Sequence, residues 1–102
     1  MGLNKYQERA YKTAFYKDHH GIGGLTYTIL ALCGEAGELA NKLKKHLRAG
    51  TKPDREVLMD ELGDVLWYTS AVATELGYEL KEVARYNLAK IEKRREASKQ
   101  VG

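Results

Sequence analysis

Apolar residues recur every three to four positions along most of this chain, which is the spacing of one face of an α-helix. Several glycines and the single proline, Pro53, divide the pattern into four segments, and none alternates apolar and polar residues as a strand would. The pattern predicts helices over about 4–18, 25–48 and 54–76, and a fourth from about residue 79 into the C-terminal tail. The predicted fold class is therefore all-α, a four-helix, bundle-type arrangement with short links.

Residues at the expected helix ends support this division. Asn4, with Gln7 three residues later, is predicted to cap the first helix. Ala49 and Gly50 are predicted to end the second helix, and the third begins near Asp54, directly after the proline. The second helix carries the longest apolar stripe, which consists of Leu25, Ile29, Leu32, Ala36, Leu39, Leu43 and Leu47. We expect this stripe to face the core.

Two pairs of carboxylates lie at the polar borders of the second and third helices. Glu35 and Glu38 belong to the segment Glu-Ala-Gly-Glu-Leu, and Glu61 and Asp64 belong to Glu-Leu-Gly-Asp-Val. Each pair is spaced i, i+3, so its two members project from one side of their helix. On a helical projection both pairs lie roughly 60–140° from the centre of the apolar arc, on the same rotational side. Two such helices packed side by side would bring four carboxylates together.

Four carboxylates at close quarters repel one another strongly unless a cation holds them. Oxygen ligands without cysteine or histidine favour Mg²⁺ or Mn²⁺ over zinc. Gly37 and Gly63 lie between the paired acids, where a glycine costs a helix about 1 kcal/mol relative to alanine. Close approach of a neighbouring helix or a ligand would explain them. A solvated acidic border is the alternative, and the shared spacing and position of the two pairs favour the metal site.

Length and composition limit the choice further. A chain of 102 residues, 43% hydrophobic and 30% charged, is expected to form a single domain over residues 1–102, with a core often completed by a second copy. Cys33 is the lone cysteine, lies in the apolar arc and is expected to be a reduced core residue, which favours a cytoplasmic protein. No apolar run approaches the ~20 residues that span a bilayer, so no membrane partner is expected. The net charge of +3 is too small to indicate a nucleic-acid-binding surface.

The chain resembles the MazG-like nucleotide pyrophosphohydrolases of the all-α NTP pyrophosphatase superfamily. The resemblance rests on Glu-x-x-Glu at 35–38, Glu-x-x-Asp at 61–64 with 22 residues between the two motifs, and a downstream Asn-x-x-Lys at 87–90. It implies Mg²⁺-dependent hydrolysis of standard or modified (d)NTPs between the α and β phosphates, giving a monophosphate and pyrophosphate in a house-cleaning role. It also implies a homo-oligomer, either a dimer or a tetramer, with the active site near a subunit contact.

The resemblance also implies roles for the acids. Glu35, Glu38, Glu61 and Asp64 would be the catalytic residues and would hold Mg²⁺, with Mn²⁺ as a substitute. Metal ions there would neutralise phosphate oxygens and lower the pKa of a bound water. One carboxylate could instead act as the general base, and Glu38 is favoured because it lies farther round from the apolar arc.

Cationic and amide side chains provide candidate contacts to the nucleotide. Lys42 lies one turn beyond Glu38 and could reach a bound phosphate, or could simply pair with Glu38 on the surface. Asn87, Lys90 and Arg94 are spaced i, i+3, i+7 along the fourth helix and form a donor-rich strip suited to phosphate or sugar oxygens. A solvated basic face is the alternative for that strip.

Aromatic residues have two possible uses in this chain. Trp67 lies one turn after Asp64, opposite the main apolar arc of its helix, so we expect it at a subunit interface or against a nucleobase. Tyr6, Tyr16 and Tyr27 are expected to be core or interface aromatics rather than base contacts.

Two other functions remain open. The same fold and metal site could act on phosphoribosyl-ATP or on dUTP and dUDP, as in sister families. Alternatively, the chain could be a non-enzymatic helical module that binds nucleic acid or protein through its basic fourth helix. Such a module would bind in a salt-sensitive manner without metal, and it would leave the four acids unexplained.

Overall fold

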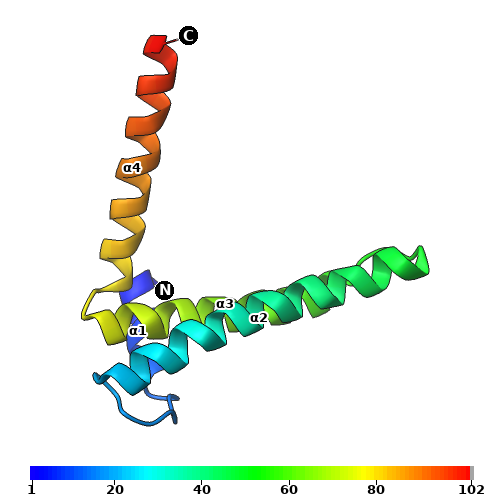
Figure 1. Cartoon of the computed structure of the whole chain (residues 1–102), viewed down its shortest axis with the longest axis horizontal. Helices are drawn as coiled ribbons and strands as arrows, with labels where there is room; N and C mark the ends of the chain where they lie inside the picture. The colour runs from blue at the N-terminus through cyan, green and yellow to red at the C-terminus, as the bar shows by residue number, and fades with distance from the viewer. Residues whose placement is uncertain (102) are drawn as a thin grey trace.

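The computed structural model describes residues 1–101, which form four helices: α1 (Leu3–Tyr11), α2 (Ile22–Ala49), α3 (Arg55–Leu76) and α4 (Leu80–Val101). The described residues contain no strand, so the predicted all-α class is confirmed. Helices α2 and α3 run antiparallel, side by side, as a long hairpin (Figure 1). Helix α1 packs against α3 at the open end of the hairpin, and α4 leads away from it (Figure 1).

The ends of α2 and α3 form where the sequence predicts them. Gly50 and Gly77 end α2 and α3 with φ angles of 70° and 82°, a left-handed conformation that glycine adopts without steric cost. Asp54 caps α3, because its side chain accepts hydrogen bonds from the backbone N–H groups of Glu56 and Val57 at 3.1 and 3.3 Å. The predicted bounds of the second and third helices are therefore close to those observed.

The first helix is shorter than predicted, ending at Tyr11 rather than near residue 18. The Thr13 hydroxyl donates to the Ala10 carbonyl at 2.7 Å, and this bond competes with continued helical bonding. Residues 12–21 form a loop instead, in which Asp18 adopts a φ of 60° and its carboxylate accepts a hydrogen bond from Gly23 N at 2.7 Å. Because this acceptor serves the first turn of α2, that helix begins at Ile22, earlier than expected.

The predicted cap of the first helix is wrong, since Gly2 occupies the capping position and Asn4 and Gln7 lie inside α1. Both side chains reach the start of α4 instead. Gln7 Oε1 accepts from Leu80 N at 2.8 Å, and Asn4 Oδ1 accepts from Lys81 N at 3.0 Å. These bonds satisfy two of the amides that every helix N-terminus leaves unpaired, and they fix the point from which α4 departs.

The core within one chain is small. Its buried side chains are Thr28, Ser70, Ala71, Ala73 and Leu80, so only one of them is a large apolar residue. Much of the predicted stripe of α2 remains open, with Leu43 at 47% and Leu47 at 81% exposure, and Cys33 is exposed rather than part of a core. The interpretation of Cys33 as a core residue is therefore wrong for the single chain.

The overall dimensions agree with this open packing. The Cα radius of gyration is 16.8 Å, against about 13 Å for a compact domain of this length. The accessible surface is 7891 Å², against about 5,800 Å² expected for a compact monomer of this mass. Within the described part of the chain, none of the helices has the length and apolarity needed to cross a membrane.

Candidate metal centre and adjoining cavity

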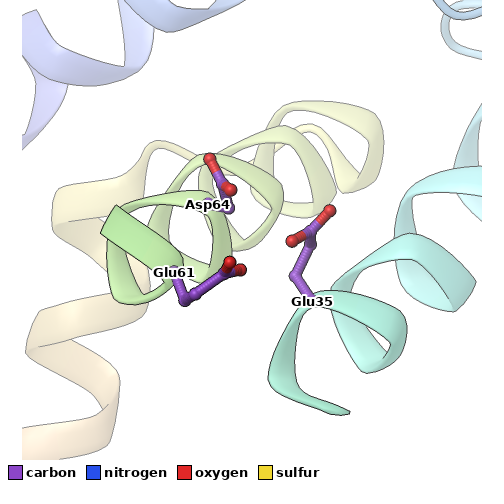
Figure 2. A group of neighbouring side chains, drawn as sticks. All are labelled: Glu35, Glu61 and Asp64. Carbon is purple, nitrogen blue, oxygen red and sulfur yellow. The ribbon is translucent and has the colours of Figure 1, made fainter. Parts of the chain in front are cut away.

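Three of the four predicted acids come together where α2 and α3 lie side by side. The Glu35 side chain leaves α2 and points toward Glu61 and Asp64 on α3 (Figure 2). One carboxylate oxygen from each of the three lies within 4.8 Å of the others. Because Glu61 and Asp64 are one turn apart, they face the same neighbour, and the antiparallel hairpin sets Glu35 opposite them. The spacing seen in the sequence thus becomes a cluster in space.

Glu38 lies outside this group. It is exposed on α2, one turn beyond Glu35, and its oxygens are not among those that converge. Its negative charge nevertheless acts on Glu35. The pKa of Glu35 is raised above its usual range, first by burial and then by the charges of Asp64, Glu61 and Glu38. Negative charges disfavour the ionisation of a neighbouring carboxyl group, and a bound cation would reduce this repulsion.

A cavity of about 810 Å³ adjoins the acids and is lined by both Glu35 and Asp64. Five aromatic side chains form much of its wall: Phe15, Tyr16, Tyr27, Trp67 and Tyr68. Its size is within the range of small-molecule sites, which combine an apolar lining with a few placed polar groups. The cavity therefore places aromatic ring faces next to three converging carboxylates.

Hydrogen bonds and ring contacts connect the aromatic wall. The Trp67 indole N–H donates to Thr13 Oγ1 at 3.0 Å, and its ring packs edge-on against Tyr68 with centroids 4.9 Å apart. The hydroxyls of Tyr27 and Tyr68 lie 3.5 Å apart. This bond, burial and the negative charges of Tyr27, Glu35 and Asp64 raise the pKa of Tyr68 to about 12. The negative charges of the nearby acids thus contribute to the raised pKa of Tyr68.

The cavity wall includes residues that the sequence pattern did not single out. Tyr16 and Tyr27 were expected in a core or interface, yet both line the cavity, and Phe15, Lys17 and Tyr68 do so as well. Lys17 is the cation of this lining. Residues 15–17 lie shortly before the glycines at positions 21, 23 and 24, and Tyr68 adjoins Trp67 one turn after Asp64. Tyr68 is close to the acids because it shares α3 with Asp64, whereas the fold of the 12–21 loop brings Phe15, Tyr16 and Lys17 to the cavity.

Some predicted nucleotide contacts lie elsewhere in the chain. Lys42 is half-buried on α2 and is not part of the cavity lining, and no ion pair joins it to Glu38 within the described residues. Asn87, Lys90 and Arg94 are exposed on α4, which leads away from the hairpin (Figure 1). The structure of one chain therefore does not bring this strip to the acids, because the capped turn after Gly77 directs α4 outward.

Comparison with known proteins gives two matches. A family model described as the MazG nucleotide pyrophosphohydrolase domain matches residues 24–98, which include all four acids and the aromatic pair 67–68. The chain is also 42% identical, over 103 aligned positions, to the Gene 37 protein of Mycobacterium phage L5, an alignment that covers 94% of this chain and 90% of the phage protein. No solved structure gives a significant match.

Proposed function

Because this chain belongs to the MazG nucleotide pyrophosphohydrolase family, we propose that it hydrolyses standard or modified (d)NTPs between the α and β phosphates in a Mg²⁺-dependent reaction. The products are a nucleoside monophosphate and pyrophosphate. The observation that carries this proposal is the convergence of Glu35, Glu61 and Asp64 beside a cavity with an aromatic wall. Carboxylates that can hold a metal ion suit the phosphate chain of a nucleotide, and the aromatic rings beside them suit its base.

The family generally uses a divalent metal, and the residues present fit one. Three carboxylates offer oxygen atoms within 4.8 Å of one another, and hard oxygen ligands suit Mg²⁺ or Mn²⁺. We propose Glu35, Glu61 and Asp64 as the residues that hold the ion. When bound, it would neutralise phosphate oxygens and lower the pKa of an attacking water.

Glu38 has a different proposed role. It is exposed, lies one turn from Glu35 and contributes negative charge to the cluster without joining the three converging carboxylates. A carboxylate free of the cluster can accept the proton that a water loses as it attacks a phosphate. We therefore propose Glu38 as the general base, or as a further ligand that swings in when the ion binds.

The cavity wall supplies the proposed contacts to the rest of the nucleotide. Trp67 and the tyrosines offer ring faces on which a base can stack, which is worth about 1–3 kcal/mol per base. Lys17 lines the same cavity and can pair with a phosphate oxygen, and Lys42 extends the positive charge along α2. The acids and the aromatic residues then bind opposite ends of one substrate.

A second copy of the chain is the proposed partner of the open apolar faces. The surface exceeds that of a compact monomer by about 2,100 Å². Obligate homodimers commonly bury about 2,000–5,000 Å² counted over both partners, so an excess of this size on each of two copies is large enough for a stable contact. Gly37 and Gly63 have nothing within 4 Å of where a side chain would begin, which leaves room for a neighbouring helix. Association would also let Asn87, Lys90 and Arg94 of one copy approach the site of another.

The test is product analysis after incubation of the purified protein with a panel of NTPs, dNTPs, dUDP and phosphoribosyl-ATP, with Mg²⁺ or with a chelator. We expect Mg²⁺-dependent release of pyrophosphate with the matching monophosphate, and the panel ranks the bases and sugars. Release of a diphosphate with inorganic phosphate would contradict the proposed bond cleavage. Equal turnover in excess chelator would contradict the proposed metal dependence.

A further inference from the structure

One buried carboxylate, Glu75, lies outside the acid cluster and has no role in the chemistry described above. It belongs to α3, eleven residues beyond Asp64 and therefore about 16 Å farther along the helix. Its side chain is 0% exposed. A buried carboxylate is costly unless hydrogen bonds replace the water that it has lost, so its partners identify what it holds in place.

The partners of Glu75 all belong to the loop between α1 and α2. Its Oε1 accepts from the Tyr16 hydroxyl at 2.5 Å, and its Oε2 accepts from the backbone N–H of His20 at 2.5 Å. His19 Nδ1 lies 4.0 Å from Oε1. Each carboxylate oxygen thus fixes a different part of the loop, one through a side chain and the other through the backbone.

This loop forms one side of the nucleotide cavity. Residues from Thr13 to Asp18 contribute five of the cavity-lining side chains, including Tyr16 and Lys17. The Tyr16 ring stacks on His19 with centroids 4.1 Å apart and contacts Tyr27 at 5.8 Å. Glu75 is therefore connected to the cavity through the residue that its Oε1 binds, although it does not line the cavity itself.

The loop backbone is held in a conformation that it would not adopt alone. Asp18 and His20 have φ angles of 60° and 65°, a region that residues with side chains populate sparsely. The backbone N–H of His20, which this conformation orients, donates the hydrogen bond that the Glu75 carboxylate accepts. Gly24, at the start of α2, is packed so closely that an added Cβ would lie 3.2 Å from the Glu75 carboxyl carbon. Such conformations persist only where surrounding contacts determine them.

We propose that Glu75 is a positioning residue for the nucleotide site, holding Tyr16 and the 12–21 loop in the place where they contact the substrate. The inference rests on the proposed function, because the cavity must bind a nucleotide for its wall to affect turnover. Glu75 touches neither substrate nor metal in this account. It acts through Tyr16, which forms part of the wall, and through the backbone that carries Lys17.

The test compares Glu75→Gln with the wild-type protein. Glutamine keeps the size of the side chain but is uncharged and has only one acceptor oxygen, so the Tyr16 hydroxyl and the His20 amide can no longer both donate to it, and both lose the stronger bond to a carboxylate. We expect the KM for the best nucleotide of the panel to rise about tenfold, with kcat changed less than about twofold and Mg²⁺ affinity unchanged. Trp67 is the lone tryptophan and is bonded to Thr13 of the same loop, so its fluorescence should shift to longer wavelength in the ligand-free variant.

A matched control and a second variant complete the design. Glu79→Gln changes an exposed carboxylate that bonds to Asn4 and does not line the cavity, and it should leave KM and Trp67 fluorescence unchanged. Tyr16→Phe keeps the ring but removes its hydroxyl, and should raise KM in the same direction. If Glu75 acts through Tyr16, the two changes combined should raise KM by less than the product of their separate effects. Tyr16→Phe also carries the test if Glu75→Gln does not fold.

The outcomes distinguish a failure of the positioning role of Glu75 from a failure of the proposed function. An active wild-type enzyme whose Glu75→Gln variant has an unchanged KM and unchanged Trp67 fluorescence would overturn the positioning role and leave the proposed function intact. A variant that melts at a lower temperature with the same KM would show that Glu75 only supports the fold, which also overturns it. If the wild-type protein neither binds nor cleaves any nucleotide of the panel, the proposed function fails, and this inference fails with it.

Discussion

The α2–α3 hairpin and helix α4 carry predicted site residues in very different settings. In the hairpin, acids from two helices converge within one chain, next to a cavity that the 12–21 loop of the same chain helps to line. Along α4, Asn87, Lys90 and Arg94 are exposed and have no part in that cavity. The first region is assembled by packing within one chain, whereas the second lies apart from the acids of its own chain (Figure 1). Helical spacing alone therefore does not tell whether residues of different helices meet within one chain.

The largest expected effect concerns the hairpin. Asp64→Asn and Glu61→Gln each remove a proposed metal ligand, so turnover should fall about 10³-fold or more while the helical content stays the same. Asp60→Asn is the matched control, because Asp60 is an exposed neighbour on α3 that is absent from the cluster. Steady-state kinetics with circular dichroism measure both quantities. Full activity in Asp64→Asn would remove the hairpin acids from the mechanism.

The second effect tests whether α4 serves another copy of the chain. Asp64→Asn and Lys90→Ala chains should each be poorly active alone. Suppose that the acids of one chain and Lys90 of its partner form one site in a dimer. Refolding an equal mixture of the two variants makes half of the dimers mixed, and in each of these one of the two sites has unchanged acids and an unchanged Lys90. About a quarter of all sites should therefore be active. A mixture of Asp64→Asn and Glu61→Gln should restore nothing. A lack of recovery in the first mixture would show that the α4 strip does not act across subunits.

The third effect tests the open apolar faces directly. Leu30 on α2 and Leu62 on α3 are 67% and 55% exposed in one chain. Leu30→Asp or Leu62→Asp would place a charge in the proposed contact, so the protein should become monomeric and melt at a lower temperature. Lys44→Glu, an exposed change on α2, should have little effect on either property. Sedimentation velocity would decide the matter, and a wild-type protein that is already monomeric would rule out self-association.

The smallest effect lies in the tyrosines beside the acids. The bond to Tyr27, burial and nearby negative charge raise the pKa of Tyr68 to about 12, so Tyr27→Phe should lower it toward the ordinary value. A raised pKa means that the folded state retains the proton more strongly. Its stabilising contribution is complete below pH 10 and is lost as the pH rises through about 12. Ultraviolet titration of wild-type, Tyr27→Phe and Tyr68→Phe proteins measures this shift, and identical curves would contradict it.

The sequence predicted helix identity and the acid cluster more reliably than it predicted the loop. Helical periodicity fixed α2 and α3, and the i, i+3 spacing of Glu61 and Asp64 set both on the face that meets Glu35. These are local properties, so they can be read from neighbouring residues. The path of the 12–21 loop could not, because Tyr16 and His20 are held by Glu75, a distant residue on α3.

Two other differences have the same physical origin. Asn4 and Gln7 match a local capping pattern, yet they bond to the start of α4, some 75 residues away along the chain. The apolar stripe of α2 marks residues that avoid water, but it does not say whether the same chain or another copy covers them. Such tertiary contacts depend on which surfaces pack together, and the spacing of residues within one helix does not determine this.

The most direct test of the central claim is calorimetric titration of Mg²⁺ into metal-free protein, comparing the wild type with a variant in which Glu35, Glu61 and Asp64 are changed to Gln, Gln and Asn. Removing all three carboxylates takes away the converging oxygen ligands and should leave the helices folded. We expect saturable Mg²⁺ binding by the wild type and none by the folded variant. Equal binding by both proteins would contradict the assignment of these three acids as the metal centre.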